Sequence, residues 1–370
     1  MIKYIHIENF KSIKKIGVPL SKLNLFFGMN GMGKSSTIQS LLLCRQSFWK
    51  NGCNSIESVF PNGDLIELGT SGEVFCHNAD NNSMLIRLTD QAGVNSEIKC
   101  GFNTGNSLAN YLECEQDMIV DYTSSLFSND NFVYLSAEHL GPQRKYDYSK
   151  WNTNGINKFG NRGEYVVPFL SMFGDKIVVP DELCIFDTEN RTNKLLDQAS
   201  VWMGKISPGV RLNTELLAGD QEARLKISYN KDWMVSSSNT PVNVGFGIPY
   251  VLPIIIALLT SNKDSLILIE NPESHLHPKG QTAMAELMAK SAAYGAQVLC
   301  ESHSDHIING ARVAVKEEVI SPDDITIAYY SKDAELNSVA NIIQVDKNGN
   351  LDDYPEGLID EWGYLMSRLM

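Results

Sequence analysis

The sequence lacks the features that mark several protein classes by composition alone. Its seven cysteines are scattered singly with no CxxC pair, which favours reduced thiols over a disulfide framework or a zinc ribbon. Lys and Arg number 31 against 44 Asp and Glu, a net charge of −13, which excludes coating of nucleic acid by bulk positive charge. The apolar fraction of 43% can fill a large core and excludes a disordered or collagen-like chain.

Long hydrophobic runs and repeats are also missing. The most apolar stretch, Val244–Leu259, is shorter than the roughly 20 residues of a membrane span and is interrupted by glycine and proline. Residues 1–10 alternate apolar and polar residues like a strand and lack the apolar core of a signal peptide. No heptads are sustained, so a long coiled-coil arm is not expected. These absences predict a cytoplasmic protein without membrane contact.

Strand and helix patterns alternate at both ends of the chain. An apolar strand at Leu23–Phe27 precedes a helical pattern at 34–48, and short β-like segments from 56 to 100 indicate an antiparallel meander. Residues 106–132 have a helical pattern. The middle region includes a predicted helix at 190–206. The last third predicts an α/β arrangement, with strands at 266–270, 297–301 and 325–330 and helices at 244–259, 278–293 and 303–315.

A glycine-rich loop carries the strongest chemical signal. Residues 28–35, GMNGMGKS, fit G-x-x-x-x-G-K-[ST] between a strand and a helix. Such a loop turns backbone N–H groups toward phosphate oxygens at a helix N-terminus, with the lysine on the β- and γ-phosphates and the serine hydroxyl on Mg²⁺. The expected ATP contacts are Gly28, Asn30, Gly31, Gly33, Lys34, Ser35 and Ser36.

A second group of polar residues follows two buried strands. The strand 265–270 ends in Glu270, as expected of a Walker B strand that holds the metal, and Asn271, Glu273 and the segment 274–278 come next. Another buried strand is followed by 300–304, CESHS, with His303. This arrangement predicts a nucleotide site that uses both strand ends.

Together these motifs resemble the ABC-type ATPase heads of the RecF, SMC and OLD (overcoming-lysogenisation-defect) class. The sequence is most similar to stand-alone bacterial ATPases of that class with an IENPE-type Walker B, here residues 269–273. Residues 346–361 resemble that group's short closing domain of unnamed function. The resemblance implies an α/β P-loop fold with a mixed sheet, a β-rich N-terminal flank and an inserted lid lobe.

The resemblance also implies a composite site in a homodimer that forms on ATP, with higher oligomers left open. Asn243, Gly245 and Gly247 match the signature loop, which touches the γ-phosphate of ATP on the opposite subunit, with Asn243 in place of serine. Residues 274–277 match the D-loop at the dimer interface. His303 matches the switch histidine that senses the γ-phosphate, and Gln143 matches the glutamine that reaches the metal. The implied Mg²⁺ ligands are therefore Ser35, Glu270 and Gln143.

The general base is the point at which the sequence departs from the family. Asn271 occupies its usual place, and an amide can orient water but cannot accept a proton. Either Glu270 or Glu273 takes that role, or hydrolysis is slow. The loss of a general base costs roughly a hundred- to ten-thousand-fold in rate.

Other readings of the polar residues stay open. His275, His277, His303 and His306 lie near acids and would suit a transition metal, although the nucleotide site already accounts for them. Asp305 either orients His303 or supplies charge to the first turn of a helix. The basic and aromatic residues of 144–151 fit either a nucleic-acid groove or a solvated loop.

We expect four segments: 1–105 with the phosphate loop, 106–239 as the inserted lid lobe, 240–335 with the signature, Walker B and switch histidine, and 336–370 as the closing segment. The predicted function is an ATP-hydrolysing switch of bacterial antiviral defence or DNA maintenance. The short stretch after the helix near Val315 leaves no room for a nuclease, so the effector, such as a nuclease, is expected on a separate chain, with DNA as a candidate ligand. The alternatives are an ATP-binding scaffold with little hydrolysis and a metal-dependent nuclease.

Overall fold

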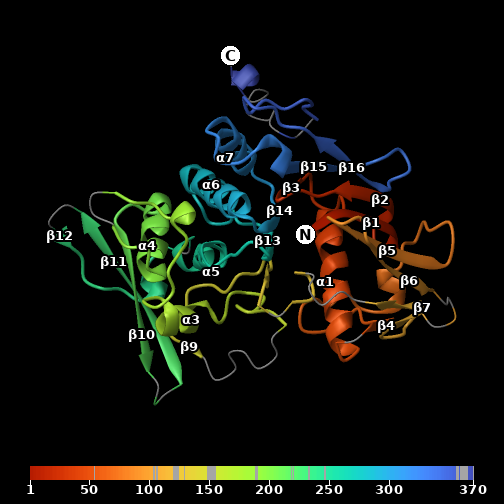
Figure 1. Cartoon of the computed structure of the whole chain (residues 1–370), viewed down its shortest axis with the longest axis horizontal. Helices are drawn as coiled ribbons and strands as arrows, with labels where there is room; N and C mark the ends of the chain where they lie inside the picture. Colours follow the sequence, from red (N-terminus) through yellow and green to blue (C-terminus); the bar gives the residue numbers. More distant parts are fainter. Residues whose placement is uncertain are drawn as a thin grey trace. The chain divides into compact units, whose positions relative to one another are not determined.

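The computed structural model of the chain divides into two compact units (Figure 1). The first unit contains residues 1–132, 322–346 and 350–370, and the second contains 133–321 and 347–349. These units are not the four segments expected from the sequence, which remain a prediction. The structure describes residues 1–53, 55–102, 105, 107–119, 125–128, 130–147, 156–187, 191–217, 219, 221–231, 234–245, 247–355, 358 and 366–369.

An antiparallel sheet of six strands forms the β-rich flank of the first unit. Its order is β2-β1-β5-β6-β7-β4, and neighbouring strands pair antiparallel throughout. The antiparallel strands predicted between residues 56 and 100 are present, but β4 pairs with β7 and not with β5, so the meander begins at β5. The strands are β1 (Ile2–Phe10), β2 (Ile13–Pro19), β4 (Ser55–Val59), β5 (Ser83–Asp90), β6 (Asn95–Gly101) and β7 (Leu112–Ile119), and the short helix α2 (Ser71–Val74) lies between β4 and β5 in the chain.

The strand β7 corrects the helix expected for residues 106–132. Leu112 is buried and Glu113 exposed, the alternation of a strand with one covered face. Cys114 lies opposite Cys100 of β6, with the two sulfur atoms 3.4 Å apart. Cross-strand pairing therefore overrides the weak helical pattern. Within that range, the expectation for residues 106, 120–124 and 129 lies outside the described residues.

Three further strands of the first unit position the glycine-rich loop. β3 (Leu23–Phe27) is buried along its length and pairs parallel with β15 (Ile325–Lys332), which pairs antiparallel with β16 (Ser338–Ile343). The long helix α1 (Lys34–Lys50) follows the loop, as predicted. This combination of parallel and antiparallel pairs confirms the mixed sheet expected from the sequence.

The second unit is built around a buried helix and parallel strands. β13 (Leu266–Glu270) pairs parallel with β14 (Gln297–Glu301) and has β8 (Phe132–Leu135) as a neighbour. α5 (Gly247–Leu259) is buried from Ile248 onward, as expected of a helix that is apolar all round. The other helices are α3 (Val166–Phe173), α4 (Leu195–Ile206), α6 (Pro278–Tyr294) and α7 (Asp305–Lys316), with 3-10 turns at Asp181–Leu183 and Pro241–Asn243. The elements predicted for residues 244–315 are confirmed.

A hairpin lies beside α4 in the second unit (Figure 1). β10 (Val210–Leu217) and β11 (Glu222–Lys231) pair antiparallel over their length, and the two-residue strands β9 (Tyr146–Asp147) and β12 (Met234–Val235) pair with β11. None of the described helices has the length and apolar character that a bilayer crossing requires.

Candidate functional site

The glycine-rich loop adopts a backbone that other residues would adopt only with strain. Gly28, Gly31 and Gly33 have φ of 131°, 78° and 111°, in the positive-φ region that strongly favours glycine. Gly33 is the residue that caps the N-terminus of α1. The spacing of these glycines in the sequence is thus explained by the path of the loop between β3 and α1.

Tyr330 of β15 and Ser338 of β16 pack closely against the glycines of this loop. A Cβ on Gly28 would lie 2.2 Å from the carbonyl oxygen of Tyr330, and one on Gly33 would lie 2.8 Å from Ser338 Oγ. Tyr330 also donates from its hydroxyl to Thr37 Oγ1 in α1, at 3.0 Å. Tyr330 and Ser338 were missed by the sequence analysis, because neither stands in a motif.

Alanine at Gly28 should destabilise the protein more than alanine at Gly31. Both glycines have positive φ, so both changes cost about 1–2 kcal/mol of backbone strain, but a Cβ on Gly31 meets no atom within 4 Å. The collision with Tyr330 adds about 1–3 kcal/mol for Gly28→Ala. Denaturant unfolding without nucleotide measures the difference, and equal free energies of unfolding for the two variants would contradict the arrangement.

Lys34 is held inside the loop. It is 3% exposed, and its Nζ donates to the carbonyl oxygens of Gly28 at 2.8 Å and Met29 at 2.9 Å. The first turn of α1 contains no acidic residue, and no side chain among the described residues caps Gly33. The positive end of the helix and the ammonium group therefore coincide, which is the electrostatic setting for a bound phosphate.

The remaining residues of the loop differ in exposure. Asn30 and Gly31 are exposed, Ser35 is half-buried and Ser36 is buried. All of them lie in the first unit, so the structure brings the predicted phosphate contacts together in one segment.

Glu270 ends β13 in the second unit and is fixed by two donors. Its Oε1 accepts a hydrogen bond from the Tyr134 hydroxyl at 3.2 Å, and its Oε2 accepts from Ala137 N at 3.0 Å. Burial raises the pKa of Tyr134 well above its usual range, and the charge of Glu270 adds to this, so the phenol stays a donor. The carboxylate is therefore held in a fixed orientation, and carboxylate oxygens are ligands that Mg²⁺ prefers.

The chain turns sharply after Glu270. Asn271 has a φ of 50°, and its backbone N–H donates to the carbonyl oxygen of Glu301 at 2.9 Å. His275 also has a positive φ, 62°. Asparagine tolerates this conformation better than most residues. The backbone of the turn is therefore one reason for an asparagine at position 271, in addition to its place in the motif.

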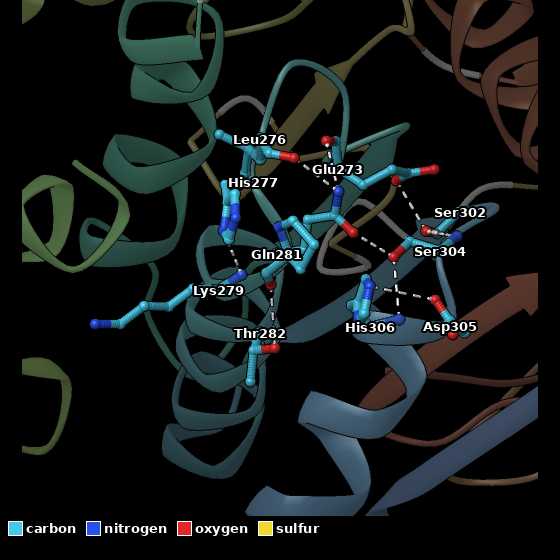
Figure 2. Close-up of polar contacts among 11 residues, drawn as sticks. Glu273, Leu276, His277, Lys279, Gln281, Thr282, Ser302, Ser304, Asp305 and His306 are labelled. Atoms are coloured by element: carbon cyan, nitrogen blue, oxygen red, sulfur yellow. Dashed lines mark hydrogen bonds and ion pairs between the residues drawn. The ribbon is translucent and has the colours of Figure 1, made fainter. Parts of the chain in front are cut away.

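Glu273 ties the turn after β13 to the turn after β14 (Figure 2). Its Oε2 accepts from the Ser302 hydroxyl at 2.8 Å. Its Oε1 accepts from the backbone N–H of His303 at 2.7 Å. Gln281 adds a second link, since its Oε1 accepts from Ser304 Oγ at 2.5 Å and its Nε2 donates to Leu276 O at 2.9 Å. The predicted D-loop and switch segments are therefore brought together.

The histidines of these turns are arranged in different ways. His303 is exposed, and His277 caps α6 by accepting from Lys279 N. Asp305 lies in the first turn of α7, with Oδ1 3.7 Å from Nε2 of His306. Among the described residues, no group of three or more His, Cys, Asp or Glu side chains is arranged to hold a metal ion.

The predicted signature segment lies at the start of α5. Asn243 and Gly245 are exposed, and a Cβ on Gly247 would lie 2.8 Å from the carbonyl oxygen of His275. Gly247 thus permits close approach to the D-loop turn, while Phe246 is outside the described residues. The side chain of Gln143 donates to Gly141 O at 3.4 Å, and its role toward a metal stays a prediction.

Tyr250 connects α5 to the Glu270 turn, which the sequence did not reveal. Its hydroxyl donates to Ala137 O at 2.7 Å, and Ala137 N donates to Glu270. The ring of His139 stacks on Tyr250 with 4.4 Å between centroids, and His275 meets the same ring edge-on at 5.0 Å. Burial lowers the pKa of His139, which favours its neutral form.

Three family models match this sequence. Residues 1–166 match a family described as "AAA ATPase domain", and residues 225–309 match "AAA domain, putative AbiEii toxin, Type IV TA system". Residues 320–369 match "Protein of unknown function (DUF3696)". The first two matches contain the phosphate loop and the Glu270 segment, respectively, and they support the ATPase domain predicted from the motifs. No curated protein matches the sequence.

Solved structures of SMC heads are also similar to this chain, each with a TM-score of 0.46. The head bound to the C-winged helix domain of ScpA is 14% identical, over 94% of this chain and 99% of that one. The SMC head domain from Thermotoga maritima is 10% identical over 93% and 99%. The head with an extended coiled coil, bound to the C-terminal domain of ScpA derived from Pyrococcus furiosus, is 13% identical over 100% and 99%.

Proposed function

We propose that this chain, in which residues 1–166 and 225–309 match models of AAA-type ATPase domains, binds ATP at the loop 28–36 and hydrolyses it slowly. The observation that carries the proposal is the loop itself. Its three glycines allow the backbone to adopt positive φ at three positions. The buried ammonium group of Lys34 donates to two carbonyl oxygens of the loop at the positive end of α1. A triphosphate would replace those carbonyl oxygens as the partner of the ammonium group.

Mg²⁺ is the cofactor that this ATP chemistry requires. The hydroxyl of Ser35 and the carboxylate of Glu270 are the oxygen donors that Mg²⁺ prefers, and we keep both as proposed ligands, with Gln143 as a third. The fit rests on Glu270, which its two donors keep oriented. When bound, the ion would neutralise charge on the phosphate oxygens.

The proposed hydrolysis is slow because Asn271 cannot accept a proton. Glu273 uses both carboxylate oxygens to hold the 302–303 segment, which supports a positioning role. We assign the proton-accepting or metal-holding role to Glu270, because it ends β13 at the position of the Walker B acid, whereas the contacts of Glu273 join two turns of the chain. His303 would sense the γ-phosphate at the end of the segment that Glu273 holds.

We further propose that ATP brings two copies of the chain together. The support is the exposed position of Asn243 and Gly245, which leaves the signature segment accessible to a second copy. The description of one matched family, "AAA domain, putative AbiEii toxin, Type IV TA system", mentions a toxin–antitoxin system. This description favours a setting in antiviral defence with a separate effector. DNA contact stays a candidate in that setting.

Sedimentation velocity with and without MgATP tests this function. We expect a monomer at micromolar concentration without nucleotide, a dimer with ATP, and phosphate release at a few turnovers per minute. A monomer under both conditions would overturn the proposed dimerisation. Tight ATP retention without phosphate release would instead favour the scaffold alternative, which the amide at Asn271 motivates.

A further inference from the structure

A cavity of about 500 Å³ in the second unit gathers four cationic side chains. Two come from the segment that enters β9, and two from β11; Thr240 and Asn243 add polar groups to the wall. The cations are Arg144, Lys145, Arg224 and Lys226. In a chain with a net charge of −13, such a concentration of positive charge marks a place where an anion can bind.

The fold explains why these cations converge. In β11, Ala223 and Leu225 are buried, so the alternating Arg224 and Lys226 share the opposite face. β9 pairs with β11 through Tyr146 opposite Ala223, which places Lys145 at the same edge. Tyr146 is itself buried and anchors the segment that carries Arg144 and Lys145.

Carboxylates only partly compensate this charge. Glu222 Oε1 lies 2.5 Å from Lys145 Nζ, and its Oε2 lies 3.9 Å from Arg224, while Glu215 pairs with Lys226 at 2.8 Å. Neither glutamate lines the cavity. Exposed ion pairs of this kind contribute at most about 1 kcal/mol, so a phosphate can compete for the same cations.

We propose that this cavity binds the oligophosphate group of a nucleoside triphosphate, separately from the loop at Lys34. Its volume is that of a small-ligand pocket, and arginine forks bind phosphate in a bidentate manner. Asn243, which the sequence places in the signature segment, lines the same cavity. The inference rests on the proposed ATP function, since the nucleotide is either free in solution or held by the phosphate loop of a second copy.

The lining favours a nucleotide over nucleic acid. Single strands are held by exposed aromatic rings on which bases stack, yet the described residues of this cavity include none, and Tyr146 is buried.

The test compares two doubly neutralised variants of the full chain. Arg224→Gln with Lys226→Gln removes half of the cavity's cations. Arg87→Gln with Lys99→Gln is the control, because these are also exposed, carboxylate-paired cations on strands. Each double change is made in the natural background and in Lys34→Ala, and thermal unfolding confirms that both variants fold.

For a nucleotide held by a second copy, the cavity variant keeps MgATP binding at the loop but weakens ATP-dependent dimerisation by at least about tenfold. For a free nucleotide, Lys34→Ala retains weaker MgATP binding that the cavity substitutions reduce by a similar factor. Cavity variants that match the control in both measurements overturn the inference, even where loop binding is intact and the proposed function stands. Loss of affinity for a short DNA duplex alone overturns it in favour of nucleic acid. A natural chain that binds no MgATP defeats the inference together with the proposed function.

Discussion

Replacing Lys34 by alanine should reduce ATP turnover at least about a hundredfold and weaken MgATP binding strongly. The change removes the only ammonium group that the described structure places inside the loop, where Nζ lies 2.8 Å from Gly28 O and 2.9 Å from Met29 O. The loss of one preorganised donor to a developing phosphate charge typically costs a factor of about 10² to 10³. Phosphate release and equilibrium binding of a fluorescent ATP analogue measure the two effects.

Lys50→Ala is the matched control for this substitution. Lys50 ends the same helix, is exposed, and donates to Asn62 O at 2.6 Å, so its removal changes the net charge equally without touching the loop. We expect turnover within about twofold of the natural protein, since surface changes usually cost within about 0.5 kcal/mol. If both lysine variants kept full turnover, hydrolysis at this loop would be disproved.

The parts of the fold that could be predicted are those with strong local patterns. The glycine spacing predicted the turn between β3 and α1, because the positive φ of Gly28, Gly31 and Gly33 can be read from residue type. The buried runs that became β13 and β14 were placed from their apolar residues alone, and Pro278 marked the start of α6.

The parts that could not be predicted depend on contacts between residues far apart in the chain. Tyr330 lies behind Gly28, and Tyr250 reaches Glu270 through Ala137, yet each looks in the sequence like an ordinary aromatic residue of a strand or helix. β7 was wrongly expected to be helical, because its pairing with β4 and β6, rather than its own propensity, determines its conformation. The partners of Glu273 were equally invisible until the turns after β13 and β14 were placed.

Substitution of Glu270 should separate ATP binding from hydrolysis more sharply than substitution of Glu273. Glu270→Gln keeps the shape and one oxygen that can still ligate Mg²⁺ but removes the charge and the proton acceptor, so we expect MgATP to bind more weakly but measurably while turnover falls about a hundred- to ten-thousand-fold. Glu273→Gln keeps one acceptor for the Ser302 hydroxyl or His303 N–H, and the loss of the other contact costs about 1–3 kcal/mol, a roughly five- to 150-fold loss when it falls on turnover.

Single-turnover phosphate release distinguishes these two glutamates. Glu286→Gln is the control, because this glutamate of α6 pairs with Lys205 at 2.8 Å and plays no part in the proposed site. Glu273→Gln should also lower the stability of the protein, since the tie between the turns after β13 and β14 is weakened, whereas Glu270→Gln should act mainly on the rate. The reverse ranking, with Glu273→Gln inactive and Glu270→Gln nearly normal, would transfer the proton-accepting role to Glu273. It would refute the positioning role that we assign to Glu273 from its contacts with Ser302 and His303.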